Sequence, residues 1–213
     1  MPGRIRIIAG RLRNSKLEVR GTAGLRPTPE RVRETLFNWL APEIEGARCL
    51  DAYAGTGALG IEAWSRGAGE VVLVERDATL ARDIAANLAR LRVANARVEQ
   101  RDVLAWLATA PNVAAVHATL GADDIARARR GFDIVFVDPP FDAGLWSDTC
   151  AALDRNGWLA PGALVYLEWP NGAGPGVPPG WREHRSARAG EVNYALYRNS
   201  PAAATLAGAS PDG

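Results

Sequence analysis

The sequence predicts an α/β fold: a doubly wound, seven-stranded, mostly parallel sheet with an antiparallel hairpin at one edge. After residue 42, short apolar runs alternate with helical stretches, which is typical of a parallel sheet covered by helices on both faces. The last two apolar runs have no helix between them, which indicates an antiparallel pair at the sheet edge. A chain of 213 residues with 47% hydrophobic content is long enough for one substantial core.

Residues 1–40 predict an extension made of a β-hairpin and a helix. Between residues 5 and 19, two alternating runs flank a polar turn, which indicates two short strands. Thr28 is the expected N-cap of the helix, with Pro29 at the first helical position and Glu30 in the first turn. The helical pattern of apolar residues then runs to Leu40.

Residues 41–199 form the predicted main domain. We expect its strands at Arg48–Tyr53, Glu70–Glu75, Arg97–Arg101, Phe132–Val137, Ala163–Glu168, Arg182–Ser186 and Val192–Tyr197. We expect its helices at Ala58–Arg66, Ala78–Leu91, Val103–Ala110 and Leu145–Leu153. Residues 111–130 are an insertion whose acids precede arginines, which favours a short extra helix. Residues 200–213, rich in small residues and proline, are expected to be disordered.

The formal net charge of +1 conceals an asymmetry along the chain. Residues 1–40 carry nine Arg or Lys against three Glu, which is +6, whereas the remainder carries 16 against 21, which is −5. A basic arm on a mildly acidic body indicates a polyanionic partner, and a solvated arginine-rich surface is the alternative. The residues that we expect to contact nucleic-acid phosphates are Arg4, Arg6, Arg11, Arg13 and Lys16.

Other features of the sequence exclude several classes of protein. No apolar stretch approaches the ~20 residues of a membrane helix, and no apolar signal segment begins the chain, so we expect a soluble, cytoplasmic protein with no membrane partner. Cys49 is expected in a core strand and Cys150 in a helix, far from each other in sequence. With only His117 and His184 besides, no spacing suits a metal site, and we expect none.

A glycine-rich segment, Asp51–Gly60 (DAYAGTGALG), follows the first predicted strand of the main domain and opens a helix. An α/β sheet places ligands at this kind of turn, where Gly55 and Gly57 would leave room for close approach. Tight-turn glycines are the plainer alternative. The segment does not match a phosphate-binding loop, because no lysine follows it.

Acidic residues stand at the ends of the next two predicted strands. Glu75 lies about twenty residues after the glycines, where an acid can accept both hydroxyls of an adenosine ribose. Asp102 follows the third strand and could accept a hydrogen bond from an adenine amino group. Either acid alone would suggest a surface carboxylate, but together with the glycine loop they favour a nucleoside cofactor.

The segment Asp138–Phe141 (DPPF) ends an apolar strand and carries the predicted chemistry. The two prolines stop the strand and present the Asp138 carboxylate and the Pro139 carbonyl, both of which are acceptors. An exocyclic base amine is a poor nucleophile, because its lone pair is delocalised into the ring. Acceptors on its two N–H bonds help to localise that pair and receive the proton. Phe141 offers a face on which an extracted base can stack, and a strand-ending turn is the alternative.

The glycine loop and the DPPF segment resemble the cofactor and catalytic motifs of the class I amino-methyltransferases, which have a Rossmann-like fold. The N-terminal segments look specifically like the RsmD family, the 16S ribosomal RNA guanine-N2 methyltransferases of bacteria. Those segments are Arg6–Gly10 (RIIAG), Leu25–Thr28 (LRPT) and Arg31–Phe37 (RVRETLF). The similarity runs from about Arg4 to Arg198, and the insertion at 111–130 departs from the family pattern.

The resemblance implies that S-adenosyl-L-methionine is the cofactor. Its substrate would be a guanine of 16S ribosomal RNA within an assembling small ribosomal subunit, bound by a monomer. The implied cofactor contacts are Asp51, Tyr53, Gly55, Gly57, Glu75 and Asp102. Catalysis is implied at Asp138 and Pro139 with Phe141, and Arg26 and Thr28 would close over the cofactor or the target.

Two other functions remain open at this stage. A DNA adenine-N6 or cytosine-N4 methyltransferase would share the DPPF segment, although it usually needs a larger target-recognition region than a 40-residue arm. A catalytically inactive RNA-binding or assembly factor is the second alternative. The acids at 51, 75, 102 and 138 argue against the inactive factor, since binding RNA alone does not require them.

Overall fold

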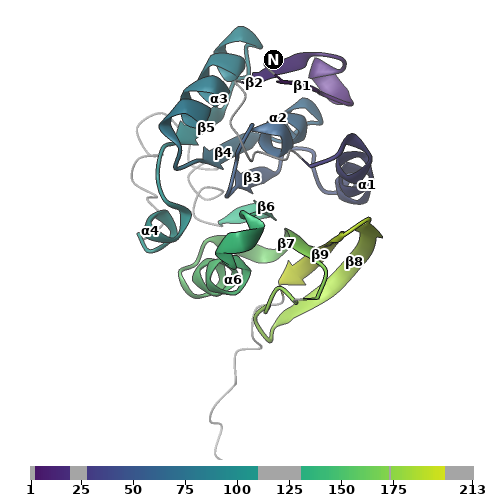
Figure 1. Ribbon diagram of the computed structural model, residues 1–213, viewed down its shortest axis with the longest axis vertical. Helices are drawn as coiled ribbons and strands as arrows, with labels where there is room; N and C mark the ends of the chain where they lie inside the picture. The colour runs from purple at the N-terminus through teal and green to yellow at the C-terminus, as the bar shows by residue number, and fades with distance from the viewer. Residues whose placement is uncertain (1–2, 20–27, 110–130, 173, 200–213) are drawn as a thin grey trace, which may run out of the picture.

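The computed structural model describes residues 3–19, 28–109, 131–172 and 174–199. These residues form a seven-stranded sheet with helices on both faces and a separate two-stranded hairpin (Figure 1). The strand order of the large sheet is β5-β4-β3-β6-β7-β9-β8. The strands are β3 (Arg48–Asp51), β4 (Glu70–Val74), β5 (Ala96–Glu99), β6 (Phe132–Val137), β7 (Leu159–Pro170), β8 (Trp181–Ala189) and β9 (Val192–Asn199).

This topology confirms the predicted fold class. The first five strands in this order pair in parallel, and β9 pairs antiparallel with both β7 and β8. The predicted edge hairpin is therefore present, and it inserts β9 between β7 and the edge strand β8. The chain adds β4 and β5 on one side of β3 and then β6 on the other, so the sheet reverses its winding between β3 and β6, and the carboxyl ends of these two parallel neighbours open a crevice.

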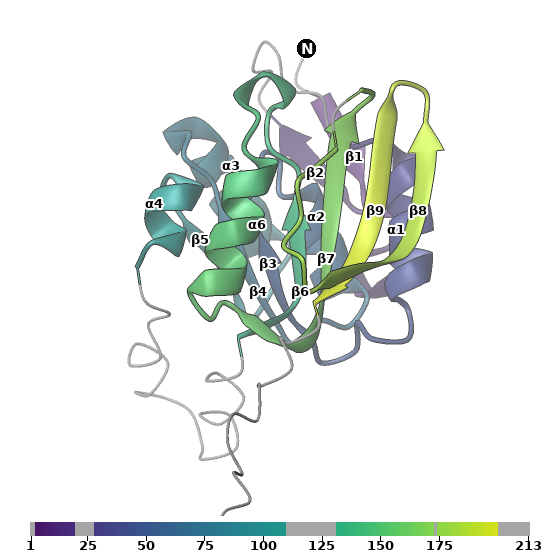
Figure 2. The same cartoon turned by 90° about the horizontal axis from the view of Figure 1, so that it is seen from below.

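Helices cover both faces of the sheet, and each face buries its own hydrophobic core. α1 (Glu30–Leu40), α2 (Ala58–Ser65) and α3 (Ala78–Arg90) pack on one face. α4 (Val103–Leu107) and α6 (Trp146–Arg155) pack on the other, as Figure 2 also shows. Strand β6 serves both cores, because its side chains alternate: Phe136 belongs to the first core and Val137 to the second.

The N-terminus of α1 differs from the prediction. The helix begins at Glu30, its N-cap position is Pro29, and no side chain caps it. Thr28 was therefore wrongly predicted as the N-cap. Its hydroxyl instead donates a hydrogen bond to Asp138 Oδ2 at 3.2 Å, so this side chain contacts a residue 110 positions away and does not cap the helix.

The predicted N-terminal hairpin is confirmed as β1 (Gly3–Arg6) and β2 (Lys16–Val19), joined through the short 3-10 helix η1 (Gly10–Leu12). It packs into the body of the protein. Ile7 and Leu17 are fully buried in the core under α1 and α2. The Glu62 carboxylate of α2 accepts the backbone N–H groups of Ile8 and Ala9. The hairpin is thus an integral layer of the fold, and not an appended arm.

Three predictions fall outside the described residues: the short helix of the insertion, the disordered tail and the role of Arg26. Within the described ranges, no helix has the length and apolar character needed to cross a membrane.

Candidate functional site

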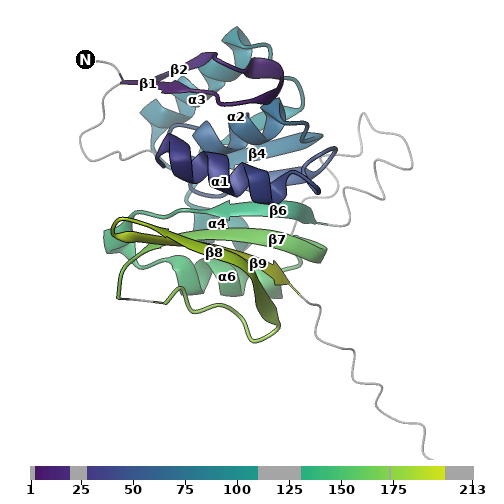
Figure 3. The same ribbon diagram turned by 90° about the vertical axis from the view of Figure 1, so that its right-hand side faces the viewer.

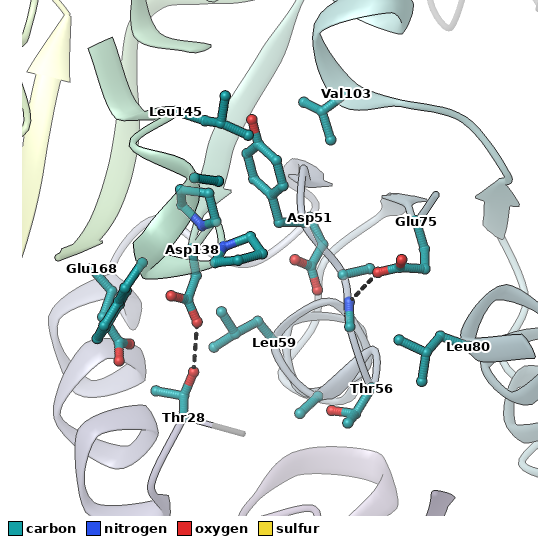
Figure 4. A pocket seen from close by; sticks show the side chains of 18 of the residues that line it. Thr28, Asp51, Thr56, Leu59, Glu75, Leu80, Val103, Asp138, Leu145 and Glu168 are labelled. Atoms are coloured by element: carbon teal, nitrogen blue, oxygen red, sulfur yellow. Dashed lines mark hydrogen bonds between the residues drawn. The ribbon is translucent and has the colours of Figure 1, made fainter. Parts of the chain in front are cut away.

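A cleft of about 590 Å³ lies where the carboxyl ends of β3, β4, β6 and β7 meet, which is the point where the sheet reverses its winding. This volume lies within the range of small-molecule and cofactor pockets. Its polar lining comes from six chain segments that are far apart in sequence, and Figure 4 shows most of these side chains around the cleft. The polar residues at its centre are Thr28, Asp51, Glu75, Asp102, Asp138 and Glu168.

The glycine loop forms one wall of this cleft, but its two predicted glycines do different things. Gly55 lines the cleft with a φ of +53°, a left-handed conformation that favours glycine. Gly57 has a φ of +76° and does not line the cleft. A side chain at Gly57 would meet Ile84 of α3 at 3.2 Å, so this glycine allows α2 and α3 to pack closely.

Glu75 holds the glycine loop in place from the end of β4. One of its carboxylate oxygens accepts the Gly55 N–H at 2.8 Å, and the other accepts the Asp77 N–H at 2.8 Å. The residue is nearly buried and still lines the cleft. A carboxylate has about four acceptor positions, so these two bonds leave acceptor capacity for hydroxyl groups of a ligand.

Two further predicted cofactor contacts also lie at the cleft. Asp102 is the N-cap of α4, where its Oδ1 accepts the Ala105 N–H at 3.0 Å. The Tyr53 hydroxyl lies 2.6 Å from the Thr149 hydroxyl of α6, which fixes the half-buried ring on the cleft wall. The cleft therefore offers acids just after two neighbouring strands and a ring nearby, which fits a ligand with hydroxyls, an amino group and a flat base.

Asp51 is almost fully buried below the glycine loop, where its Oδ2 accepts the Gly60 N–H at 2.9 Å. Burial raises the pKa of its carboxyl group to about 7, and the negative charge of Glu75 adds to the rise. The folded protein therefore holds this proton more tightly than the unfolded chain does. The resulting stabilisation is complete at low pH and is lost as the pH rises through about 7.

Asp51→Asn should accordingly stabilise the protein more at pH 8 than at pH 5, because at pH 5 the folded wild-type carboxyl is still neutral and only part of the stabilisation has been lost. The amide oxygen can keep the bond from Gly60. One pKa unit corresponds to about 1.4 kcal/mol, so the gain at pH 8 is at most about 4 kcal/mol. Urea unfolding of both proteins at the two pH values measures it. Equal stability at pH 8 would show that the Asp51 charge costs the fold nothing.

Asp138 and Pro139 follow β6 directly and face the same cleft. The Asp138 carboxylate accepts a hydrogen bond from the Thr28 hydroxyl and lies on the sheet face that carries α1. Burial raises the pKa of the Asp138 carboxyl group well above its ordinary value, and the negative charge of the neighbouring Glu168 raises it further. The hydrogen bond from Thr28 opposes this rise. A carboxyl group with a raised pKa is a suitable proton acceptor near neutral pH.

Phe141 begins a short 3-10 helix, η3 (Phe141–Ala143), at the mouth of the cleft. Its side chain is 39% exposed, and no other large hydrophobic side chain among the described residues is exposed. The ring stands 6.2 Å from that of Trp146, tilted by 44°. An exposed ring at the rim of a polar cleft offers a flat surface to an incoming aromatic group.

The five basic residues predicted to bind phosphates are all exposed on the hairpin: Arg4, Arg6, Arg11, Arg13 and Lys16. They are not equivalent. Arg6 pairs with Glu30 at 2.7 Å, near the start of α1 and the cleft. Arg11 lies over the ring of Trp64, in the last turn of α2, at the end of that helix away from the cleft. The basic residues therefore extend over one side of the molecule from the cleft outward.

Sequence reasoning missed Glu168, which lines the cleft beside Asp138. A signal was available, because the predicted strand 163–168 ends in this acid, just as neighbouring strands lead to Asp51, Glu75 and Asp138. It also missed the apolar residues that complete the walls. They include Leu59, Leu80, Val103 and Leu145, which the fold brings in from four helices or their ends.

A family model described as "Conserved hypothetical protein 95" matches residues 5–198. The Escherichia coli (strain K12) protein named ribosomal RNA small subunit methyltransferase D is 46% identical over 198 residues, which cover 92% of this chain and 90% of the relative. The chain belongs to this family, the RsmD family. The resemblance noted in the sequence is thereby confirmed.

Solved structures agree with this assignment. The Escherichia coli protein yhhF superposes with a TM-score of 0.76 at 42% identity, covering 94% of this chain and 100% of that one. An RNA methyltransferase from Salinibacter ruber, solved in complex with S-adenosyl-L-homocysteine, superposes with a TM-score of 0.56 at 17% identity. That match covers 82% of this chain and 94% of the other. The likeness in fold confirms the predicted class I methyltransferase architecture.

Proposed function

We propose that this protein transfers a methyl group from S-adenosyl-L-methionine to the exocyclic N2 amine of a guanine in 16S ribosomal RNA. Membership of the RsmD family supports the reaction and the ribosomal RNA substrate. The observation that carries the chemistry is the Asp138 carboxylate, held by Thr28 in a cleft at the winding reversal of the sheet. The same cleft has room for a nucleoside cofactor next to this carboxylate.

The residues around the glycine loop fit the cofactor. When bound, S-adenosyl-L-methionine supplies a methyl group on a positively charged sulfur, which is an already activated leaving group. Glu75 would accept hydrogen bonds from the ribose hydroxyls. Its bonds to Gly55 and Asp77 leave enough acceptor positions on the carboxylate for this. Asp102 would accept the adenine amino group. Asp51 lies below the glycine loop. The positive charge of the bound cofactor would favour the ionised form of its carboxyl group.

The DPPF segment would hold the target amine. The Asp138 carboxylate and the Pro139 carbonyl accept its two N–H bonds, which localises the nitrogen lone pair for an in-line attack. Asp138 then takes the proton that the methylated amine must lose. Thr28 donates to one oxygen of this carboxylate and so fixes its orientation. Positioning supplies most of the rate enhancement in this arrangement.

The target base must leave its stack to reach the cleft, at a cost of a few kcal/mol that is least for a loop nucleotide. Phe141→Ala should weaken binding of the target by about 1–3 kcal/mol through lost stacking, whereas Phe141→Trp should keep activity. Because the ring is 39% exposed, the melting temperature should change little. A large drop in melting temperature with full activity per folded molecule would show that Phe141 only packs against Trp146.

Exposed basic residues of the hairpin should hold the RNA phosphates. Replacing Arg11 and Arg13 with alanine should lower RNA affinity and reduce the slope of log affinity against log salt by roughly one unit per lost contact. The matched control is Arg182→Ala with Arg185→Ala, which removes two exposed arginines from β8, at the opposite end of the molecule (Figure 3). Unchanged affinity and slope in the hairpin variant would place the RNA surface elsewhere.

The hairpin variants are preferable to a truncation. Deleting the first 20 residues would also remove Ile7 and Leu17 from the core and leave Glu62 without two backbone donors. Point substitutions of exposed arginines change charge without this damage.

We propose that the protein acts in the cytoplasm, as a monomer, on 16S ribosomal RNA within an assembling small subunit. An assembling particle can present a loop nucleotide in an unstacked form, which reduces the cost of bringing the base into the cleft.

A strain from which the gene is deleted tests the proposal. Mass spectrometry of the nucleosides from its 16S ribosomal RNA should show the loss of one N2-methylguanosine, and sequencing of the fragment identifies the target guanine. Its DNA should keep all of its methylated adenines and cytosines. Loss of a methylated base from DNA instead would favour a DNA methyltransferase.

A further inference from the structure

Asp138 and Glu168 stand side by side at the ends of two paired strands. β6 and β7 are parallel, with Phe136 opposite Tyr166 and Val137 opposite Leu167. The next step in this register brings Asp138 beside Glu168. Neighbouring strands lie about 4.8 Å apart, and alternate residues share a face, so both carboxylates project from the face that carries Phe136 and Tyr166. Figure 4 shows the two side chains pointing in the same direction.

Glu168 is firmly held at this position. Its side chain is only 5% exposed, and its Oε2 accepts the Tyr166 hydroxyl at 2.8 Å. Its backbone carbonyl accepts the Trp146 indole N–H at 2.7 Å. The fold therefore presents a second, rigid acceptor to the cleft, next to the carboxylate that handles the amine.

Two adjacent buried carboxylates are costly to maintain, because each disfavours the charge of the other. A ligand that presents two adjacent donors compensates for this cost. The Watson–Crick edge of guanine does so, because its N1–H stands next to its N2 amine. Adenine and cytosine differ, since the ring nitrogen beside their exocyclic amine is an acceptor.

We propose that Glu168 selects guanine by accepting its N1–H while Asp138 and Pro139 hold the N2 amine. This inference rests on the proposed function and deepens it, because it names the group that recognises the base. A carboxylate opposite the acceptor nitrogen of adenine or cytosine would be repelled, because two acceptors would then face each other. Such mispairing gives strong discrimination. Glu168 is then a specificity-determining residue, distinct in role from Asp138.

The base analogue 2-aminopurine separates the two roles, because it keeps the 2-amine but has an acceptor at N1. Small ribosomal subunits are reconstituted with 16S ribosomal RNA that carries either guanine or 2-aminopurine at the target position mapped in the deletion strain. Transfer of labelled methyl from S-adenosyl-L-methionine is measured as kcat/KM. The wild-type protein should prefer guanine by about tenfold to a hundredfold, the usual value of one base-edge contact.

Glu168→Gln should reduce this preference by at least about tenfold, because its amide can donate to the N1 acceptor of the analogue. Tyr166→Phe is the matched control, since it removes the internal bond to Glu168 but leaves the carboxylate in place. It should keep the preference for guanine. Cofactor binding by calorimetry and the melting temperature verify that both variants are folded.

The outcomes separate the two proposals. A wild-type protein that leaves guanine unmethylated in these subunits overturns the proposed function, and the inference with it. A wild-type protein that methylates guanine and 2-aminopurine equally well overturns the inference alone, whether or not the variants fold. A Tyr166→Phe protein that loses the preference to the same extent as Glu168→Gln shows that Glu168 is only a structural group.

Discussion

Asp138→Ala should slow methyl transfer by about 10²- to 10⁴-fold, the usual contribution of a positioned proton acceptor. The variant loses the group that accepts an amine N–H and takes the departing proton. Asp138→Asn should be slowed similarly, because an amide oxygen can orient the amine but cannot take its proton. Both variants should bind S-adenosyl-L-methionine with nearly wild-type affinity, since the glycine loop and Glu75 are untouched.

Glu75→Gln is the matched control for this experiment, because it should show the opposite pattern. Losing the charge weakens the bonds to the ligand and to Gly55 and Asp77, so cofactor affinity should fall by about 1–3 kcal/mol. At saturating cofactor its turnover should largely return. Single-turnover rates and calorimetry separate the two effects. Near-wild-type turnover by Asp138→Ala would contradict the catalytic assignment.

The pH dependence of the wild-type rate gives a second view of Asp138. Burial and the Glu168 charge raise the pKa of its carboxyl group, and only the ionised form accepts the proton. The single-turnover rate should therefore rise with pH through this raised pKa, well above the range in which an ordinary aspartate titrates. Thr28→Val removes a bond that favours the ionised carboxylate, so it should move the rise to higher pH.

Glu62→Ala should destabilise the fold by about 3–5 kcal/mol, the usual cost of breaking a buried ion pair from one side. Glu62 is fully buried, and its carboxylate accepts the N–H groups of Ile8 and Ala9 and the Nε–H of Arg66. It also faces the buried Arg33 guanidinium at 3.6 Å. Without Glu62, the Arg33 charge stays buried and the hairpin loses two of its hydrogen bonds to α2, while those to Ser65 remain.

Urea unfolding measures this effect, and the exposed pair of Arg6 and Glu30 provides the control. Both of these side chains are about half exposed. Glu30→Ala should therefore change the free energy of unfolding by less than about 1 kcal/mol. If Glu62→Ala were no more destabilising than Glu30→Ala, the buried network would not be what joins the hairpin to the body.

Patterns that are local in sequence predicted the parallel sheet and the position of the cleft. Apolar runs of the right length marked the strands, and the acids after them marked the crevice at their carboxyl ends. Asp51, Glu75, Asp102 and Asp138 all line the cleft for this reason. Some strand ends differ from the prediction by a few residues. For example, the strand expected at Arg97–Arg101 is β5, which spans Ala96–Glu99.

Contacts between distant segments could not be predicted in this way. Thr28 has the sequence context of a helix cap, and only the folded chain brings it to Asp138. The charge of the first 40 residues suggested a separate arm, whereas Ile7 and Leu17 are buried in the main core. Glu168 stood at the end of a predicted strand, but only the register of β6 and β7 places it beside Asp138.

The central claim is tested most directly by methyl transfer with purified protein. Small ribosomal subunits from the deletion strain are incubated with the protein and S-adenosyl-L-methionine that carries a trideuterated methyl group, and the 16S nucleosides are analysed by mass spectrometry. We expect trideuterated N2-methylguanosine at a single position, and none with Asp138→Ala. A deuterated methyl group on adenine or cytosine, or no transfer at all, would contradict the account.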